Sequence, residues 1–534
     1  MWIVCENCSE PGATKGEVEE RLDGLESIHA FVRSLGEREL SDGRLSRHCR
    51  FVHALYQNAL YAQLGPGKRA SLARSIADAL LHAWAGNESA IATELAFLFE
   101  TSRDFERAAH FYLIAARNAG RLFANQEAVD TATRGLRMLE FLPAGAERDR
   151  RELALRLSLG SPLMMLKGYS ARDPADNFVR VQELSAGVAA TDELFEIRFL
   201  VWLGSVVAGN FGSLLQLGSE LMEMARATGD PGKIMCAYFS LVVTNAHMGR
   251  LRAALDFANE ASSLRGDPVP PPYPASLEPV AAIQAEAVRI VWAMGFPDEA
   301  LRRAEANVER ARAIQHPETL AFALVFYAFV HQFRREPYET LTRAEQAMAL
   351  CDEHGLAQTR AWAAPVHGWA LVMTGRHDEG LAELRACVAA HAAMQSRVVV
   401  PYFHSLLAES LSVNGDVDAA LAVVDEGLAM AAATLQAFHE IELNRLRGEL
   451  LMAKGATHRE QAERYLRRAI DLAREQEARS YELRAATVLA RMMAAAGQRA
   501  EARGLLAPIS ESFTEGLETP DVQEAARLLA SLTA

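Results

Sequence analysis

The sequence has few cysteines and no apolar run long enough to cross a bilayer. Its six cysteines are scattered along 534 residues, which is no disulfide framework and favours a reducing compartment. The longest apolar stretch, LAFALVFYAFV from Leu320, is shorter than the ~20 residues that span a membrane. The opening residues, MWIVCENCSE, lack the basic region of a secretory signal. We therefore expect a soluble, cytoplasmic protein without a membrane partner.

The sequence also lacks an excess of positive charge and the common catalytic motifs. Lys and Arg total 55 against 69 Asp and Glu, and the net charge of −14 repels a polyanion such as DNA. No G-x-x-x-x-G-K-[ST], G-x-S-x-G or H-E-x-x-H motif is present. The nearest phrase, GPGKRAS at Gly65, lacks the leading glycine and carries Arg69 after the lysine. We therefore predict no enzyme activity, no cofactor and no nucleic-acid partner.

A repeat of about 40 residues dominates the chain. GRHDEGLAELRACVAA from Gly375 and GDVDAALAVVDEGLAM from Gly415 are near copies, each with a small residue five positions after the glycine. This small residue recurs at gaps of 46, 40, 40, 40, 42 and 40 residues, at Ala254, Ala300, Thr340, Gly380, Ala420, Ala462 and Ala502. Such regularity is typical of a repeat protein.

Each repeat unit is predicted to be a helix, a turn and a second helix. Glycines that can adopt the left-handed conformation end the first helices, at Gly249, Gly295, Gly375, Gly415 and Gly497. PDEALRRAEANVERAR from Pro297 then places apolar and small residues on one stripe of a helix. We predict an all-α, right-handed solenoid of roughly ten tetratricopeptide-like helix pairs. A large helical bundle is the alternative.

The composition divides the chain into five segments. Residues 1–16 form an unmatched tail. Residues 17–85 contain a hairpin signal at Asp42–Gly43, between a helix at 17–28 and a helix at about 52–64, which predicts a winged-helix-like module. The remaining segments are N-terminal repeats at 86–265, a proline-rich spacer at 266–279 and C-terminal repeats at 280–534. The spacer could also bind a proline-reading module.

Several stretches resemble bacterial signalling ATPases. RFVHALYQNALYAQLGPGKRASLARSIADAL (50–80) resembles the winged-helix segment of STAND-class ATPases. The last stretch (483–532), with 316–337 and 439–455, resembles the closing region of AAA-type ATPases that often carry a class III adenylate/guanylate cyclase domain. Family members place a P-loop ATPase domain before the winged helix. The resemblance therefore implies a sensor and interaction region that lacks its P-loop and cyclase domains.

Few residues qualify as site residues. In related proteins a winged-helix histidine reaches the β-phosphate of bound ADP, and the resemblance places His53 at that position, although Ala54 replaces the usual aspartate. His53 would therefore act only with an ATPase domain supplied in trans. The alternative is a helix-face histidine packed at the hairpin. Cys5 and Cys8 form half of a zinc site, with His48 and Cys49 as distant companions, and one such pair predicts no metal.

Recognition is the function that this organisation favours. A solenoid presents a long concave surface on which a protein, a peptide or a small effector can lie. Four tryptophans fall in predicted first helices, where they pack between repeats or line this groove: Trp202, Trp292, Trp362 and Trp369. The alternatives are a freestanding scaffold, or a chain that keeps the ATP-binding, cyclase-type or transcription-regulating role of its relatives.

Overall fold

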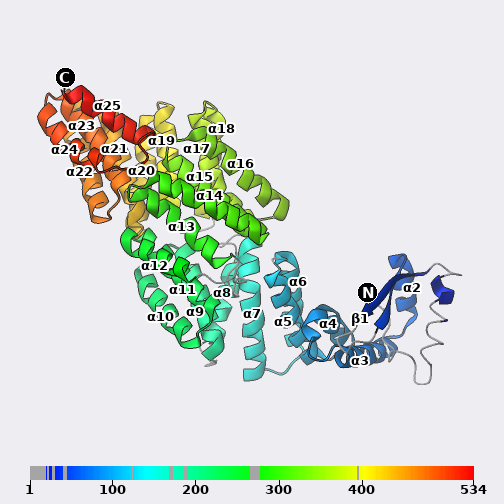
Figure 1. Cartoon of the computed structure of the whole chain (residues 1–534). Coiled ribbons are helices and arrows are strands. Elements are labelled where there is room, and N and C mark those ends of the chain that lie inside the picture. The colour runs from blue at the N-terminus through cyan, green and yellow to red at the C-terminus, as the bar shows by residue number, and fades with distance from the viewer. Residues whose placement is uncertain are drawn as a thin grey trace. The chain divides into compact units, whose positions relative to one another are not determined.

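The computed structural model describes residues 20, 23–26, 31–39, 45–122, 124–167, 172–185, 191–264, 277–393 and 396–533. Its contacts divide the chain into two compact units (Figure 1). Unit 1 comprises Met1–Pro162 with Glu183–Val188, and unit 2 comprises Leu163–Gln182 with Ala189–Ala534. None of the helices in the described ranges has both the length and the apolar composition that a bilayer crossing requires.

Unit 1 begins with a hairpin. Strands β1 (Val32–Glu39) and β2 (Leu45–Phe51) pair antiparallel, with Val32 opposite Phe51. Helices α2 (Ala54–Gln63) and α3 (Pro66–Ala83) follow. The predicted hairpin and the helix after it are confirmed, whereas the turn at Asp42–Gly43 lies outside the described residues.

The rest of unit 1 is helical. Its described helices α4 to α7 surround a core in which Leu95, Phe99 and Tyr112 are at most 1% exposed. The bounds are α4 (Ala92–Thr101), α5 (Phe105–Arg121), α6 (Asn125–Leu139) and α7 (Ala146–Lys167), which runs on into unit 2. The single-turn helix η1 (Glu88–Ile91) precedes α4.

Unit 2 is a helical-repeat solenoid. From α9 onward, odd-numbered helices are the first helices of the repeats and even-numbered helices are the second. Their bounds are α9 (Thr191–Val207), α10 (Leu214–Thr228), α11 (Pro231–His247), α12 (Leu251–Ser263), α13 (Pro279–Ala293), α14 (Pro297–Ile314), α15 (Pro317–Phe333), α16 (Pro337–His354), α17 (Ala357–Met373), α18 (His377–Ala393), α19 (Val400–Val413), α20 (Val417–Thr434), α21 (Ala437–Ala453), α22 (Arg459–Glu475), α23 (Arg479–Ala495), α24 (Arg499–Glu511) and α25 (Pro520–Thr533). Helix α8 (Arg172–Ser185) precedes them.

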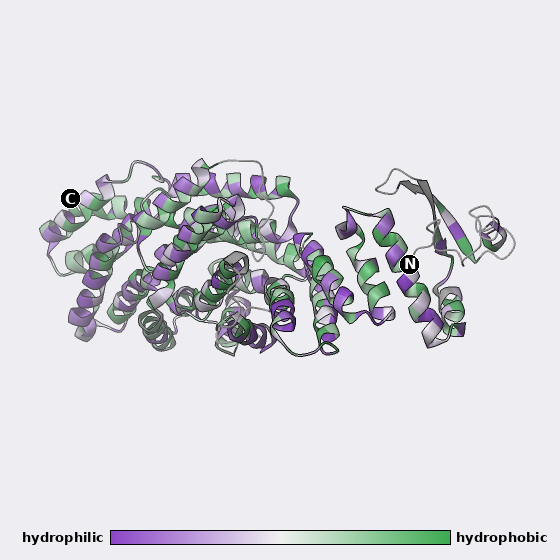
Figure 2. Cartoon of the chain, turned by 90° about the horizontal axis from the view of Figure 1, so that it is seen from below, coloured by the Kyte–Doolittle hydropathy of each residue, from purple (hydrophilic) through white to green (hydrophobic). Residues whose placement is uncertain are grey.

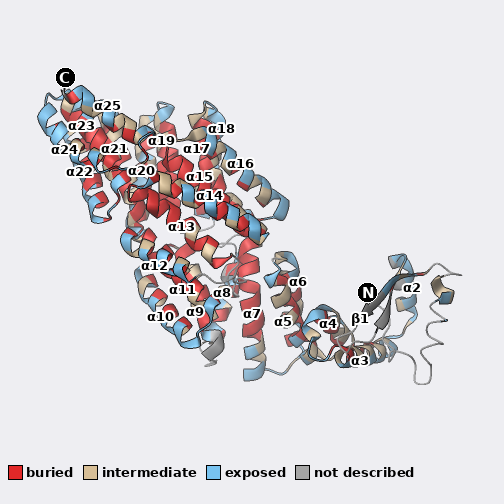
Figure 3. Cartoon of the chain, in the orientation of Figure 1, coloured by how far each residue is buried: buried red, intermediate tan, exposed pale blue. Residues whose placement is uncertain are grey.

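First and second helices occupy different environments. Each first helix packs on its own second helix and on the first helix of the next repeat, so the first helices form a continuous inner wall. They are buried on nearly all sides, whereas the second helices bury one stripe and expose the rest (Figure 3). Polar and apolar residues accordingly alternate along many helices (Figure 2). The predicted all-α solenoid is confirmed in these described residues.

The predicted small residues are all buried between helices, as the repeat pattern requires. Gly380 of α18 shows why size matters: a Cβ there would lie 2.3 Å from the carbonyl oxygen of Gly368 on α17. Ala254, Ala300 and Thr340 are 0% exposed at the equivalent positions of α12, α14 and α16. Close approach of the two helices within a repeat therefore depends on these positions.

The turn after each first helix has one residue in the left-handed conformation. The glycines predicted for this role have φ between 75° at Gly249 and 97° at Gly295, and Gly209 and Gly455 serve in two further repeats. In the repeat of α15 and α16 the residue is instead Arg335, with φ of 61°. We call these eight positions the turn positions of unit 2.

Three turn positions lie against parts of the chain that follow several repeats later. A Cβ on Gly209 would be 2.7 Å from Thr434 Cγ2 and 2.9 Å from Arg397 Cβ. One on Gly249 would be 2.5 Å from Gln476 Cδ, and one on Gly295 would be 3.1 Å from Arg479 Cβ. Backbone hydrogen bonds strengthen the first contact, since the Arg397 N–H donates to the Val207 carbonyl at 2.9 Å. Early and late repeats of unit 2 therefore touch directly.

Gly209 both adopts the left-handed conformation and allows close approach of a later repeat. These two roles can be tested together at Gly209, with Gly375 as the matched control. Gly375 has φ of 95° and a Cβ there would meet nothing within 4 Å, so Gly375→Ala should cost only the left-handed backbone term, about 1–2 kcal/mol. Gly209→Ala should cost a further 1–3 kcal/mol, roughly, because the new methyl group overlaps Thr434 and Arg397. Scanning calorimetry on the two variants compares the unfolding transition of unit 2, and equal shifts would contradict the contact.

Candidate functional site on the inner wall

Aromatic side chains from distant repeats close much of the inner wall. Trp292 of α13 stacks on Phe333 with ring centroids 4.9 Å apart, and the edge of Tyr481 from α23 meets it at 5.0 Å. Tyr402 of α19 stacks on His439 of α21 at 5.4 Å. The predicted groove is therefore filled here by the protein's own side chains.

Polar groups in this region are paired across the wall. The Tyr402 hydroxyl donates to Gln332 Oε1 at 2.8 Å, and the Ser480 hydroxyl donates to the Trp292 carbonyl at 2.6 Å. The Ser480 bond joins α23 to the end of α13, 188 residues earlier in the chain. Because a buried polar group without a partner is costly, these pairs fix the register between early and late repeats.

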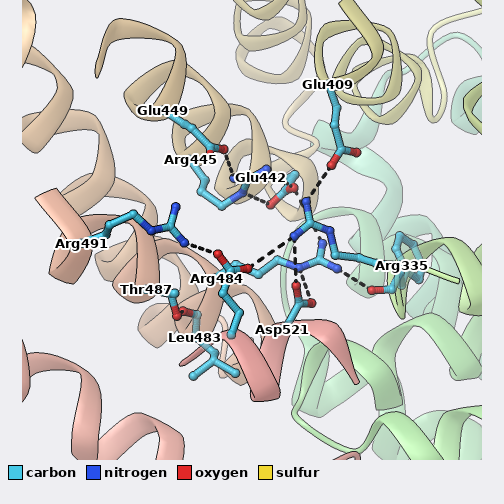
Figure 4. A network of polar contacts seen from close by, with 12 residues as sticks. Arg335, Glu409, Glu442, Arg445, Glu449, Leu483, Arg484, Thr487, Arg491 and Asp521 are labelled. Carbon is cyan, nitrogen blue, oxygen red and sulfur yellow. Dashed lines mark hydrogen bonds and ion pairs between the residues drawn. The ribbon is translucent and has the colours of Figure 1, made fainter. Parts of the chain in front are cut away.

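A network of ion pairs also joins helices of the inner wall (Figure 4). Arg335 contacts Glu409 of α19 at 3.0 Å and Asp521 of α25 at 3.5 Å. Arg484 of α23 contacts the same Asp521 at 2.7 Å and also donates to the Phe333 carbonyl. Arg484 therefore ties α23 to the end of α15, where Arg335 follows. We call this group, completed by Glu442, Arg445 and Glu449 of α21, the ionic network.

The electrostatics of the ionic network are nearly balanced. Burial alone would raise the pKa of Glu442, but Arg445 at 2.9 Å and Arg484 at 3.7 Å outweigh it and lower the pKa to about 2. Arg445 also contacts Glu449 at 2.5 Å. The network thus holds the Glu442 carboxylate ionised, and its paired groups contribute structure rather than a free charge for a ligand.

Arg335 occupies its turn position with its backbone in a strained conformation. An L-residue in the left-handed region is strained by about 1 kcal/mol, and the other turn positions of unit 2 avoid the strain with glycine. The Arg335 side chain reaches acids on two helices, which glycine could not do. We infer that the side-chain contacts offset the backbone strain.

A cavity of about 70 Å³ opens at the other end of the inner wall. It lies between α9, α11, α13, α15 and α17, and we call it the aromatic pocket. Its walls are formed largely by five aromatic side chains, Phe199, Trp202, Phe239, Phe322 and Trp362. Aliphatic side chains such as Val243 and Ala282 complete an almost wholly apolar lining.

The polar residues His247 and Glu286 also line the aromatic pocket. Burial, with a smaller effect of nearby Arg289, keeps the pKa of His247 well below its ordinary value, so this ring is neutral. Glu286 accepts from Arg289 Nε at 2.8 Å, and both side chains are at most 4% exposed. The buried His247 Nδ1 and Trp362 Nε1 have no hydrogen-bond partner among the residues that the structure describes. The lining of the pocket therefore carries no unbalanced charge, and these two nitrogen atoms are covered by neighbouring atoms.

The four tryptophans divide between the two expected roles. Trp292 and Trp369 are 2% exposed and pack in the core. Trp202 and Trp362 line the aromatic pocket, and the Trp202 indole donates to Thr244 Oγ1 at 3.0 Å. Composition and repeat phase singled out these residues, whereas His247, Glu286 and Arg335 carried no such signal.

His53 lies in unit 1, apart in the chain from both inner-wall features. It is the N-cap of α2, where its Nδ1 accepts from the Leu55 N–H at 3.1 Å, and its side chain is exposed. The alternative of a histidine packed at the hairpin is therefore wrong. Within the described ranges, no group of three or more His, Cys, Asp or Glu side chains could hold a metal ion, and Cys5 and Cys8 lie outside these ranges.

The phrase GPGKRAS begins a helix. Gly65 is the N-cap of α3 and Pro66 is its first residue. Arg69 Nε donates to the Leu64 carbonyl at 2.7 Å, and the guanidinium lies over the Tyr61 ring at 4.7 Å. The basic side chain after the lysine is thus used in local structure.

No model of a known protein family matches the sequence, and no curated protein matches it. Among solved structures, a Rap protein complexed with competence and sporulation factor has a TM-score of 0.53 at 13% identity, over 69% of this chain and 98% of that one. A STAND signal-transduction ATPase with a tetratricopeptide repeat sensor, from Pyrococcus horikoshii, has a TM-score of 0.35 at 13% identity, over 87% and 75%. The likeness to the Rap protein agrees with a helical-repeat solenoid and concerns the fold alone.

The balance between backbone strain and side-chain contacts at Arg335 can be tested by comparison with Gln315, an exposed residue with φ of 57°. Gln315→Gly should stabilise unit 2 by about 0.5–1 kcal/mol, because only strain is removed. Arg335→Gly relieves the same strain but leaves Glu409 and Asp521 without this partner, so a net loss of about 1–2 kcal/mol is expected. Calorimetry would contradict the inferred role if both variants were stabilised.

The lowered pKa of Glu442 predicts an acid-dependent stability. Because the pKa is about 2 when folded and near 4.5 when unfolded, the carboxylate stabilises the fold above pH ~4.5 and loses this effect as pH falls towards 2. Glu442→Gln should therefore lower the melting temperature of unit 2 at pH 7, and the difference from the unaltered protein should shrink between pH 4.5 and 2. Glu309→Gln, which alters an exposed pair with Arg312, is the control and should show no such trend. A pH-independent difference for Glu442→Gln would refute the prediction.

Proposed function

We propose that this chain is the non-catalytic sensor and protein-interaction region of a cytoplasmic signal-transduction ATPase of the cyclase-linked AAA or STAND type. The observation that carries the proposal is the aromatic pocket, an apolar cavity on the inner wall of a repeat solenoid. Such walls suit the recognition of a peptide, a protein segment or a small effector. The resemblance of residues 50–80 and 483–532 to ATPases of this class supplies the link to signalling.

In this proposal residues 17–85 act as a winged-helix module that docks on a nucleotide-binding domain in trans. Its hairpin and α2 expose large apolar side chains, with Leu35 44%, Leu55 67% and Leu60 46% exposed. Apolar side chains left in water on one small module favour a protein interface. The exposed His53 at the start of α2 could then reach a bound nucleotide supplied by the partner.

The repeats supply the sensing part of the proposal. Residues 86–265 and 280–534 form two arrays of repeats on either side of the spacer 266–279. A ligand in the aromatic pocket contacts five first helices at once, so its binding changes how these helices stack. That change alters the surface that the repeats offer to the ATPase partner.

The docking step is tested with a separately expressed P-loop domain from an ATPase of this class. Analytical ultracentrifugation should detect a complex with the full chain, and Leu55→Asp with Leu60→Asp should weaken it at least about tenfold because exposed apolar contacts are lost. Leu122→Asp is the control, since Leu122 is 79% exposed elsewhere in unit 1. Calorimetric titration of the chain alone with ATP and ADP should show no saturable binding. Micromolar nucleotide binding would overturn the non-catalytic assignment, and the lack of any complex would favour a freestanding scaffold.

A further inference from the structure

Two buried histidines lie next to each other across the contact between early and late repeats. His247 lies in the last turn of α11 and His439 in the first turn of α21, and their ring centroids are 6.3 Å apart. Both residues are at most 3% exposed. The ring of Phe211 covers the first at 5.1 Å, and the ring of Tyr402 covers the second at 5.4 Å. The pair is therefore enclosed within the contact and separated from solvent.

A proton on either ring is poorly accommodated in this place. In the charged form both ring nitrogens carry N–H groups. The buried His247 Nδ1 and His439 Nε2, however, have no hydrogen-bond partner among the residues that the structure describes. Burying an N–H group without an acceptor costs free energy, and burying a charge costs more. Both rings are therefore held in the neutral form while the early and late repeats touch.

The titratable groups around the pair favour the neutral form as well. Burial, followed by the nearby Arg289 of α13, lowers the pKa of both histidines well below 6.5. Arg289 is paired with Glu286 of the same helix, and Gln436 opposes the shift of the α11 histidine only in part. Burial raises the pKa of Tyr402 and Tyr481, on α19 and α23, so these hydroxyls stay neutral.

We propose that His247 and His439 form a proton-sensitive switch, which releases the contact between early and late repeats when the two rings take up protons. Once the repeats separate, both rings reach water and regain an ordinary pKa near 6.5. The contact is then fully stable above about pH 6.5 and weakens as pH falls below it, because the separated state binds more protons. This switch belongs to unit 2 alone and does not depend on the proposed ATPase partner.

The size of the effect follows from the number of protons taken up. A histidine that is protonated only in the separated state favours separation about tenfold more at pH 5.5 than at pH 7.5, so the pair favours it about a hundredfold more. This range lies above the pH at which Glu442, with a pKa of about 2 in the folded protein, loses its effect. The two acid responses are therefore distinguishable.

Hydrogen exchange on the full chain measures the separation. The Arg397 and Val398 N–H groups donate to the Val207 carbonyl at 2.9 and 3.3 Å, so their protection factors report the contact between early and late repeats. These factors should fall about a hundredfold from pH 7.5 to pH 5.5 in the unaltered chain. The Ser396 N–H, which donates locally to the His391 carbonyl at 3.1 Å, should keep its protection.

Phenylalanine variants assign the effect to the two rings, because phenylalanine keeps the aromatic packing and cannot be protonated. His247→Phe and His439→Phe should each reduce the fall to about tenfold, and the double variant should abolish it. His391→Phe is the matched control. This histidine also has a pKa lowered by burial, but it packs on Cys387 and Phe403 rather than on an early repeat, so the full fall should remain.

Protection of Arg397 and Val398 that does not change with pH in the unaltered chain would disprove the inference, and this measurement needs no variant. A fall that persists in the double variant, or an equal fall at Ser396, would disprove it too. The melting temperature of each variant at pH 7.5 verifies that its repeats are folded.

Discussion

The direct contact between early and late repeats is the constraint on which the rest of unit 2 depends. Gly209 and Gly249 allow their turns to approach Thr434 and Gln476 closely enough that no side chain fits between them. This approach brings Trp292 against Tyr481 and places Arg335 beside Asp521. A solenoid whose helices stacked at a wider pitch would keep every repeat intact and lose all of these contacts. The long-range contacts thus select one superhelix among those that the repeats permit.

The same contact decides where a ligand can bind. Over α19, α21 and α23 the inner wall faces early repeats and is filled by aromatic rings and by the ionic network. Its three arginines are paired with four carboxylates, so an incoming ligand would have to displace a partner already at hydrogen-bond distance. The aromatic pocket, between α9 and α17, is lined almost wholly by apolar side chains. The pocket is therefore the part of the inner wall that the protein's own side chains leave open.

The sequence was sufficient to predict the repeats but not their pitch. The recurrence of small residues, such as Ala300 and Gly380, is a local pattern that reports how two neighbouring helices pack, and these residues are buried as predicted. Gly209 and Gly375 have the same local role, and only the fold distinguishes the one that also touches Thr434. Arg335 interrupts the glycine pattern. The contacts that explain its presence are with Glu409 and Asp521, which lie 74 and 186 positions later in the chain. His53 was placed by resemblance alone, and its role as a helix cap follows from the start of α2.

The pocket and the network share structural elements. Phe322 of α15 lines the pocket, and Arg335 lies two residues after the end of the same helix and contacts Glu409 and Asp521. Helix α17 is similar, because Trp362 lines the pocket while Trp369, two turns later, donates to Glu409 at 2.8 Å. A ligand that tilts either helix must therefore stretch bonds in the network, whose charged groups tolerate displacement poorly once buried. In the proposed sensing role, binding at the pocket would therefore shift the network only as far as the affinity of the ligand differs between two arrangements of these helices.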